Sequence, residues 1–266
     1  MKSPNDIVVN SWTELIKELY ANSWTQEIQR FRSNFAFRGL SDKNYDLKTS
    51  LLRLGVANYK LEYHIIRNFK KYAPGIPGKS SFTIWNWLVI AQHHRLPTRL
   101  LDWTFSPFIA LHFATSNLEK YTMDGAIWCV DFVKLHTLLP APLREVLDEE
   151  GAYGFTVEML SRFMPDTLNE FDRLSNEDFA LFFNPPSIND RIVNQFALHS
   201  VVSNSGTKLD EILMKHPYLY KRVIIPTTLK WEIRDKLDQA NINERILFPG
   251  LEGLCKWLKR HYSPKV

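Results

Sequence analysis

We base the fold assignment on the stretch Trp87-Leu-Val-Ile-Ala-Gln-His-His-Arg-Leu-Pro-Thr-Arg-Leu-Leu-Asp-Trp-Thr-Phe-Ser-Pro-Phe-Ile-Ala-Leu-His-Phe-Ala114, which predicts a helix, a polar turn and a second helix. The first helix, over residues 81–94, is apolar on nearly every side, which is typical of a buried helix. Ser106 and Pro107 suit the start of the second helix. The turn between them holds His93, His94, Arg95, Thr98, Arg99, Asp102, Trp103, Thr104 and Ser106. These polar groups, placed between two buried elements, must bond to one another or to a ligand.

An early segment, Phe35-Ala-Phe-Arg-Gly39, alternates as a strand does. Arg38 would then face away from Phe35 and Phe37, and Gly39 would let a ligand or another backbone approach closely. An exposed arginine at the edge of a sheet is an equally good interpretation of Arg38 alone.

The remaining segments predict strands and helices from distant parts of the chain. Ser11 and Glu14 have the spacing of a capping box, which predicts a helix directly after them. Further strands are expected near 7–10, 125–131, 196–202 and 220–225, and further helices over 57–72, 207–216, 228–239 and 251–261. Residues 134–178 predict only short helical pieces. We therefore expect one α+β domain over residues 1–266, with a helical lead-in over 1–32.

Composition narrows the class of protein. The net charge of +4 permits an anionic ligand or nucleic acid, although no basic run demands one. Cys129 and Cys255 are isolated, which predicts free thiols in a reducing compartment. The sequence shows neither an apolar signal segment nor a run that would span a bilayer, so we expect a cytoplasmic protein without a membrane partner.

Several interpretations of the polar turn stay open at this point. Asp102 could pair with Arg99 or Arg95, orient His94, or act on a ligand. His93 and His94 point about 100° apart on a helix, and a metal would need further ligands, so we predict no metal. Thr104 and Ser106 could cap the second helix, and the amides there could also bind an anion.

Well-known catalytic loops do not match this sequence. It contains no Gly-x-Ser-x-Gly elbow, no P-loop and no dinucleotide fingerprint. A hydrolase of the Ser-His-Asp type is therefore a weak alternative, and a nucleotide site would have to be built from other residues.

Three groups of motifs resemble those of the FRG-domain family. Phe37-Arg38-Gly39 resembles the tripeptide that names the family, and Ala91-Gln-His-His with Pro97-Thr-Arg-Leu-Leu-Asp-Trp103 and the Ser106–Ala114 segment resembles its central motif. Arg191 and Gln195-Phe196 resemble a third motif, and Asn243–Gly250 resembles a C-terminal signature. The resemblance runs from about residue 33 to 258, which would be the core of the domain.

The layout of these motifs also resembles that of ADP-ribosyltransferases. That resemblance implies a small, mainly antiparallel, split sheet flanked by helices. It also implies NAD as substrate and a protein or nucleic acid as acceptor of ADP-ribose. Arg38 and Arg191 would bind phosphates, Trp103 would stack on nicotinamide, and Thr104 or Ser106 would hold a ribose or phosphate. Arg191 could instead pair with Asp190, and on a helix it would share a face with Gln195.

One position departs from that pattern, because Gln195 stands where the transferases carry a catalytic Glu. An amide cannot neutralise a cationic transition state, so the carboxylate would have to come from Asp102 or another acid. We predict catalytic roles for Asp102, His94 and Gln195, and binding roles for Arg38, Gly39, Thr98, Arg99, Trp103, Thr104, Ser106 and Arg191. The leading hypothesis is an enzyme or effector that binds NAD and transfers ADP-ribose to an unknown acceptor or hydrolyses NAD. The alternatives are a non-catalytic domain that recognises an acidic partner or nucleic acid, and a nucleotide hydrolase.

Overall fold

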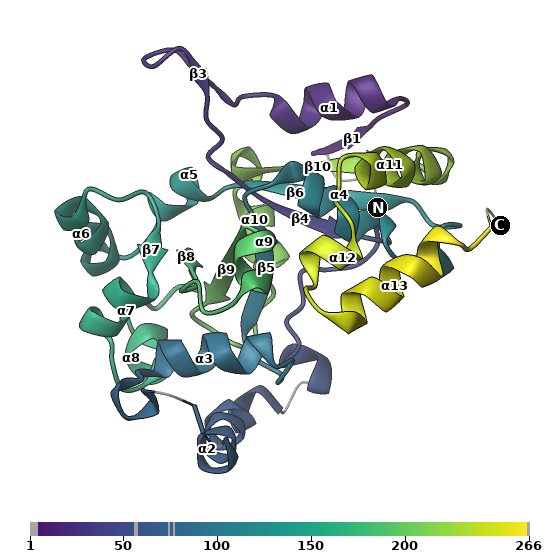
Figure 1. Cartoon of the computed structure of the whole chain (residues 1–266). Helices are drawn as coiled ribbons and strands as arrows, with labels where there is room; N and C mark the ends of the chain where they lie inside the picture. Colours follow the sequence, from purple (N-terminus) through teal and green to yellow (C-terminus); the bar gives the residue numbers. More distant parts are fainter. Residues whose placement is uncertain (1–4, 56–57, 74, 77, 265–266) are drawn as a thin grey trace.

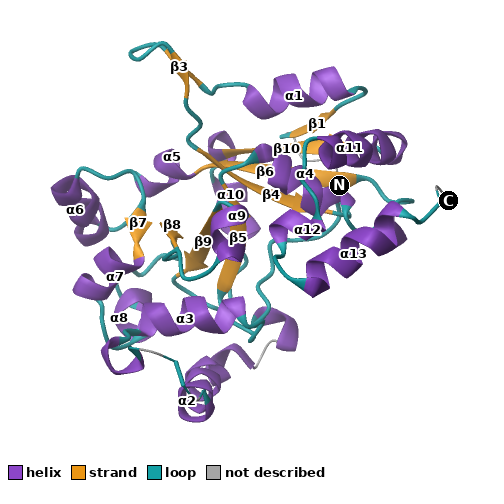
Figure 2. Ribbon diagram, viewed as in Figure 1, coloured by secondary structure: helices purple, strands orange, loops and turns teal. Residues whose placement is uncertain are grey.

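The computed structural model describes residues 5–55, 58–73, 75–76 and 78–264. Its central feature is an eight-stranded sheet with helices packed around it, and a small two-stranded hairpin stands apart from that sheet (Figures 1 and 2). The main sheet has the order β1-β10-β6-β4-β5-β9-β8-β7. Its strands are β1 (Asp6–Val8), β4 (Phe35–Leu40), β5 (Leu100–Thr104), β6 (Gly125–Asp131), β7 (Phe155–Thr156), β8 (Ala180–Asn184), β9 (Ala197–Val202) and β10 (Tyr220–Ile225). The hairpin pairs β2 (Trp24–Thr25) with β3 (Arg30–Phe31).

The expectation of a small, mainly antiparallel sheet is wrong in size, because the sheet has eight strands, and the sheet is mixed, with antiparallel inner pairs and a parallel pair at each edge. β1 pairs in parallel with β10, and β7 pairs in parallel with β8. Strands β7 and β8, at one edge of the sheet, could not be predicted from the sequence. β7 has only two residues, and β8 is apolar on both faces. Neither strand shows the alternation of a half-exposed strand.

The helices of the structure are α1 (Trp12–Tyr20), α2 (Glu62–Tyr72), α3 (Ile84–His93), α4 (Pro107–Thr115), α5 (Phe132–His136), α6 (Ala141–Glu150), α7 (Val157–Phe163), α8 (Leu168–Asp172), α9 (Asp190–Asn194), α10 (Leu209–Lys215), α11 (Thr227–Gln239), α12 (Glu244–Leu247) and α13 (Leu251–His261). Short 3-10 turns are η1 (Leu52–Leu54), η2 (Asn58–Leu61), η3 (Lys79–Ser81), η4 (Leu118–Lys120) and η5 (Pro217–Leu219). The predicted caps of α1 and α4 are confirmed, since Ser11 Oγ accepts from Glu14 N and Ser106 Oγ accepts from Ile109 N. Residue 57 of the expected 57–72 helix, and residues 74 and 77 of the following loop, lie outside the described residues. Within the part of the chain that the structure describes, no helix is long and apolar enough to cross a membrane.

The polar turn predicted between the two apolar helices contains strand β5, and this is a correction to the sequence interpretation. Every residue of β5 except Asp102 is buried, since both faces of the strand are covered. Leu100 packs in a core beneath α3, whereas Leu101 and Trp103 pack in a second core with α5 and α10. A strand that is covered on both faces does not alternate between apolar and polar residues. For this reason the sequence of β5 was interpreted as part of a turn.

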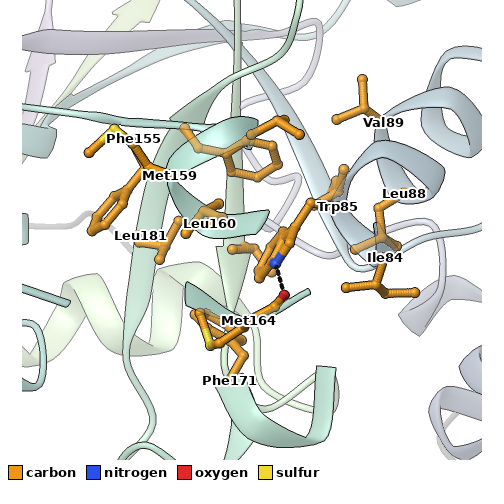
Figure 3. Packing of buried hydrophobic residues seen from close by; sticks show 14 of the residues in the cluster. Ile84, Trp85, Leu88, Val89, Phe155, Met159, Leu160, Met164, Phe171 and Leu181 are labelled. Atoms are coloured by element: carbon orange, nitrogen blue, oxygen red, sulfur yellow. Dashed lines mark hydrogen bonds between the residues drawn. The ribbon is translucent and has the colours of Figure 1, made fainter. Parts of the chain in front are cut away.

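The core beneath α3 is built around Trp85 (Figure 3). Its indole Nε1 donates to the carbonyl of Met164 at 2.9 Å, and its ring meets the edges of Phe171 and Phe183. A hydrogen-bonded, fully buried tryptophan fixes the position of α3 against β8. The end of α3 that leads into β5 is therefore held rigidly beside the sheet.

β4 and β5 are neighbours in the sheet, yet they pair at one position only, Phe37 opposite Thr104. On its other side β4 pairs with β6 along its whole length. Helix α4 lies so close to β4 that a Cβ on Gly39 would come within 1.8 Å of the carbonyl oxygen of Ala110. Gly39 therefore permits the approach of another backbone, as the sequence suggested. The position of β4 is set by its packing against α4 and its pairing with β6 more than by its single pair with β5.

Candidate functional site

A cavity of about 360 Å³ lies where β4 and β5 diverge. Its walls come from both strands, from α3, α9 and β9, and from the segments that follow β4. Its charged or titratable lining side chains are Arg38, Tyr45, Arg53, His93, Asp102, Arg191 and His199. Ligand cavities in proteins commonly range from about 300 to 1,000 Å³, so this one is at the small end of that range.

Asp102 projects from β5 into this cavity, and 62% of its side chain is accessible there. Its Oδ1 accepts from Gln92 Nε2 at 2.9 Å and lies 3.3 Å from His199 Nδ1. His199 is directly opposite Asp102 in the register of β5 and β9. Two donors from different elements, α3 and β9, thus converge on one carboxylate oxygen.

Gln92 is itself held in place. The hydroxyl of Thr98 donates to Gln92 Oε1 at 2.5 Å, so the amide nitrogen must face Asp102. Thr98 is buried, and its backbone bonds with the hydroxyl of Ser50. Thr98 therefore supports the site through Gln92 rather than by touching a ligand.

The carboxyl of Asp102 is ionised at neutral pH. Burial among protein atoms would raise its pKa, but the contacts with His199, the charge of Arg38 and the hydrogen bond from Gln92 outweigh that effect and hold the pKa below its ordinary value. The cavity thus contains a fixed negative charge that is open to a ligand.

Arg38 faces this charge from β4. Its guanidinium donates to the backbone carbonyl of Asp102, across the gap where the two strands no longer pair. Its Nε is buried and has no hydrogen-bond partner among the described residues. Burial lowers the pKa of Arg38, which Asp102 counteracts and Arg53 reinforces, but a guanidinium stays charged at any physiological pH.

The other wall carries Arg191 and His93. Arg191 lies on α9 with its guanidinium 5.1 Å from the ring centre of Phe248, and burial lowers its pKa. Burial also lowers the pKa of His93, and the neighbouring Arg191 and His94 add to this shift. His93 is therefore neutral at pH 7, and Asn189 Nδ2 approaches its Nε2 at 3.3 Å.

Thr104, Ser106 and Gln195 are tied into the backbone at the edge of the cavity. Thr104 Oγ1 donates to the carbonyl of Gln195 at 2.8 Å and accepts from the amide of Ser106 at 3.0 Å. Gln195 Nε2 donates to the carbonyl of Leu247 at 2.9 Å. Thr104 and Gln195 line the cavity, and Ser106 caps α4 outside it.

Three predicted site residues do not have the roles that the sequence suggested, although Gly39 and Trp103 both border the cavity. The ring of Trp103 is buried in the core on the opposite face of the sheet, where its Nε1 donates to Ser200 Oγ at 2.8 Å, so it offers no surface for stacking on nicotinamide. His94 is exposed at the end of α3 and does not line the cavity, and the histidine that does is His93. Gly39 is in the cavity wall, and its lack of a side chain allows α4 to pack closely against β4.

Arg99 belongs to a separate centre. Its guanidinium bonds to Glu62 at 2.6 Å and to both carboxylate oxygens of Asp172, and it lines a different cavity of about 710 Å³ between α2 and α8. Burial opposes the charge of Arg99, but Glu62 and Asp172 raise its pKa above the ordinary value. The suggested pairing of Asp102 with Arg99 or Arg95 is wrong, since Arg95 pairs with Glu252 at the surface.

Sequence reasoning missed Gln92, Arg53 and His199 as site residues. Gln92 lies within the motif of the central stretch, so its position was a usable signal. His199 sits in a segment correctly expected to be a strand, but its position opposite Asp102 depends on the pairing of strands nearly 100 residues apart. Among the residues that the structure describes, no group of three or more His, Cys, Asp or Glu side chains could hold a metal ion.

Comparison with known proteins gives one match. No curated protein and no solved structure matches the chain. Arg191, Gln195 and His199 lie outside the matched segment, which is shorter than the motif resemblance suggested. Residues 33–122, which contain Arg38, Gln92 and Asp102, match the family model described as the FRG domain.

Proposed function

We propose that the cavity between β4 and β5 binds NAD and that Asp102 assists cleavage of the bond between nicotinamide and ribose. ADP-ribose then passes to water or to a protein or nucleic acid acceptor. The observation that carries this proposal is the presence of an ionised carboxylate and three arginines in one cavity.

The arginines account for the anionic part of the ligand. Arg38, Arg53 and Arg191 line the cavity from three different segments of the chain. Guanidinium groups bind phosphate oxygens in a bidentate way, and such charge-assisted bonds are about twice as strong as neutral ones. Within the described residues the Arg38 guanidinium uses Nη1 for the carbonyl of Asp102, which leaves Nη2 for a pyrophosphate oxygen.

The carboxylate accounts for the reaction. When the glycosidic C–N bond breaks, its electron pair goes to the nicotinamide nitrogen, and positive charge develops on the ribose. An ionised Asp102 stabilises that charge in the way carboxylates do in glycosidases. The incoming water or acceptor then loses a proton, and neutral His93, which lines the same cavity, can accept it.

A binding-only role is the second candidate. It rests on Gln195, whose amide donates to the backbone of Leu247 at the position where the transferases carry an acid. In that case the arginines would hold a phosphate-bearing partner such as a nucleic acid, and Asp102 would complete the charge pattern without chemistry.

Nicotinamide release from NAD separates these candidates. We expect turnover by the purified chain, a loss of about 100-fold or more in kcat for Asp102→Asn, and weaker NAD binding for Arg38→Ala. Asp148→Asn, an exposed change on α6, is the matched control and should behave as wild type.

The same assay is repeated with labelled NAD and cell extract, which supplies an acceptor. Binding measured by calorimetry without turnover in either format would favour the binding-only role. If the purified chain neither binds NAD nor releases nicotinamide in either assay, the proposed function is ruled out.

A further inference from the structure

The carboxylate of Asp102 is held on one side only. Its Oδ1 has two donors nearby, Gln92 Nε2 at 2.9 Å and His199 Nδ1 at 3.3 Å. Among the described residues none hydrogen-bonds to Oδ2, and most of the side chain is accessible from the cavity. The two oxygens of this carboxylate are therefore not equivalent.

His199 has little freedom to do anything else. Its side chain is 7% exposed, and the ring lies 5.7 Å from that of Phe183 beneath it. Its Nδ1 is buried and has no hydrogen-bond partner in the described part of the chain, and the acceptor that lies against it, at 3.3 Å, is Asp102 Oδ1. At 3.3 Å the approach to Asp102 is long for an N–H···O bond, and catalytic contacts commonly shorten when a ligand binds.

Gln92 is equally restricted, because Thr98 fixes its amide oxygen and leaves its nitrogen for Asp102. Both donors come from rigid elements, a helix end anchored by the Trp85 core and a central strand. Two fixed donors on Oδ1 determine the rotation of the carboxylate about its own axis.

We propose that Gln92 and His199 are positioning residues that hold Oδ1 of Asp102, so that Oδ2 is the oxygen presented to the ribose of the ligand. An Nδ1–H of His199 that points at Oδ1 leaves Oδ2 without a hydrogen-bond partner among the described residues. This inference rests on the proposed function for its consequence, but the arrangement of the carboxylate can be measured without NAD.

The first test is a carboxyl ¹³C NMR titration of the full chain, with the Asp102 signal identified by its loss in Asp102→Asn. The Asp102 pKa should lie below its ordinary value in wild type and rise in His199→Leu and in Gln92→Met. Arg38, Arg191 and His93 also face this carboxyl and are unchanged in both variants. The exposed change His64→Leu on α2 is the control and should leave the Asp102 pKa where it is.

Two conservative variants identify the nitrogen that matters. The amide of His199→Asn places a donor near the position of Nδ1, whereas that of His199→Gln places one near Nε2. Asn should restore the low Asp102 pKa and Gln should not. Equal effects of Asn and Gln would overturn the assignment to Nδ1, and this comparison holds even if the Leu variant does not fold.

Kinetics with NAD provide the second readout. His199→Leu should lower kcat by about 100-fold while KM changes little, because the misplaced carboxylate affects the transition state more than binding. His199→Asn should recover most of that loss. If NAD turns over and His199→Leu keeps both the wild-type kcat and the wild-type Asp102 pKa, the positioning role is excluded while the proposed function stands. If the pKa changes occur but NAD is neither bound nor cleaved, the positioning role stands and the proposed function is excluded.

Discussion

Arg38 and Arg99 are two arginines close to the same strand with opposite environments. Arg99 is buried, and its guanidinium is surrounded by Glu62 and Asp172. Arg38 donates to one backbone carbonyl, keeps a buried Nε without a partner and faces a cavity that it shares with Arg53. A buried charge whose donors are all used holds the fold together, whereas one with unused donors is available to a ligand.

The carboxylates near the two arginines also differ in how they are bound. Asp172 and Glu62 bind Arg99 directly, and together they join α2 and α8 to the start of β5. Asp102 meets Gln92 and His199 through one oxygen, and none of the described residues hydrogen-bonds to the other. The donors of Arg99 are therefore all used within the fold, whereas Asp102 keeps one carboxylate oxygen without a hydrogen bond from the described residues.

Breaking the Arg99 centre should have the largest effect on stability. Arg99→Leu leaves Glu62 and Asp172 without their cation, and such losses typically cost about 3–5 kcal/mol in the free energy of unfolding. Arg38→Leu removes one hydrogen bond to a backbone carbonyl and leaves no carboxylate without a direct ion pair, so it should cost less, about 1 kcal/mol. Urea denaturation at pH 7 measures both, and similar losses for the two variants would contradict the distinction.

The position of Arg38 in the cavity depends on the contact between β4 and α4. Gly39→Ala places a Cβ against the backbone of Ala110, so the strand or the helix must move, at a cost of about 3 kcal/mol. Gly154→Ala, whose Cβ would meet only the ring of Phe132 at 3.4 Å, is the control and should cost much less. A Gly39→Ala variant as stable as wild type would show that this contact does not fix β4.

A smaller, pH-dependent effect should come from His136, a buried histidine with both ring nitrogens in use. Its Nδ1 donates to the carbonyl of Tyr153 and its Nε2 accepts from the amide of Phe182, so the ring must be neutral. Burial lowers the pKa of His136 to about 4, against about 6.5 in the unfolded chain.

The unfolded state then binds more protons than the folded state between those two values. The stability that His136 contributes is present above about pH 6.5 and falls by roughly 2 kcal/mol on going from pH 7 to pH 4.5. Denaturation curves at both pH values measure this loss, and His136→Gln should show a smaller one. An identical loss in that variant would assign the acid sensitivity to other groups.

Local structure was largely predictable from the sequence, whereas long-range pairing was not. The caps at Ser11 and Ser106 and the strands around Phe37, Ile127 and Val223 follow from short-range patterns. β5 did not, because burial on both faces removed its alternation, and β7 and β8 gave too little pattern to extend the sheet.

The site divides in the same way. Arg38 and Asp102 were expected from the sequence and do line one cavity. Trp103 looked equally suitable, yet neighbouring side chains in β5 point to opposite faces, and only the fold shows which face meets the cavity. Arg99 precedes β5 and is held by Glu62 and Asp172 in the other cavity. His199 required the register between β5 and β9, which no local pattern contains.

The single paired position between β4 and β5 has a mechanical consequence. Phe37 and Thr104 form the one register pair that joins the half-sheet β1-β10-β6-β4 to the half-sheet β5-β9-β8-β7. Arg38 donates to the carbonyl of Asp102 across this joint, and one hydrophobic core, with Ala36 and Leu40 from β4 and Leu101 and Trp103 from β5, lies against both halves. A ligand that bridges Arg38 and Asp102 would add a further connection between two half-sheets that share that core.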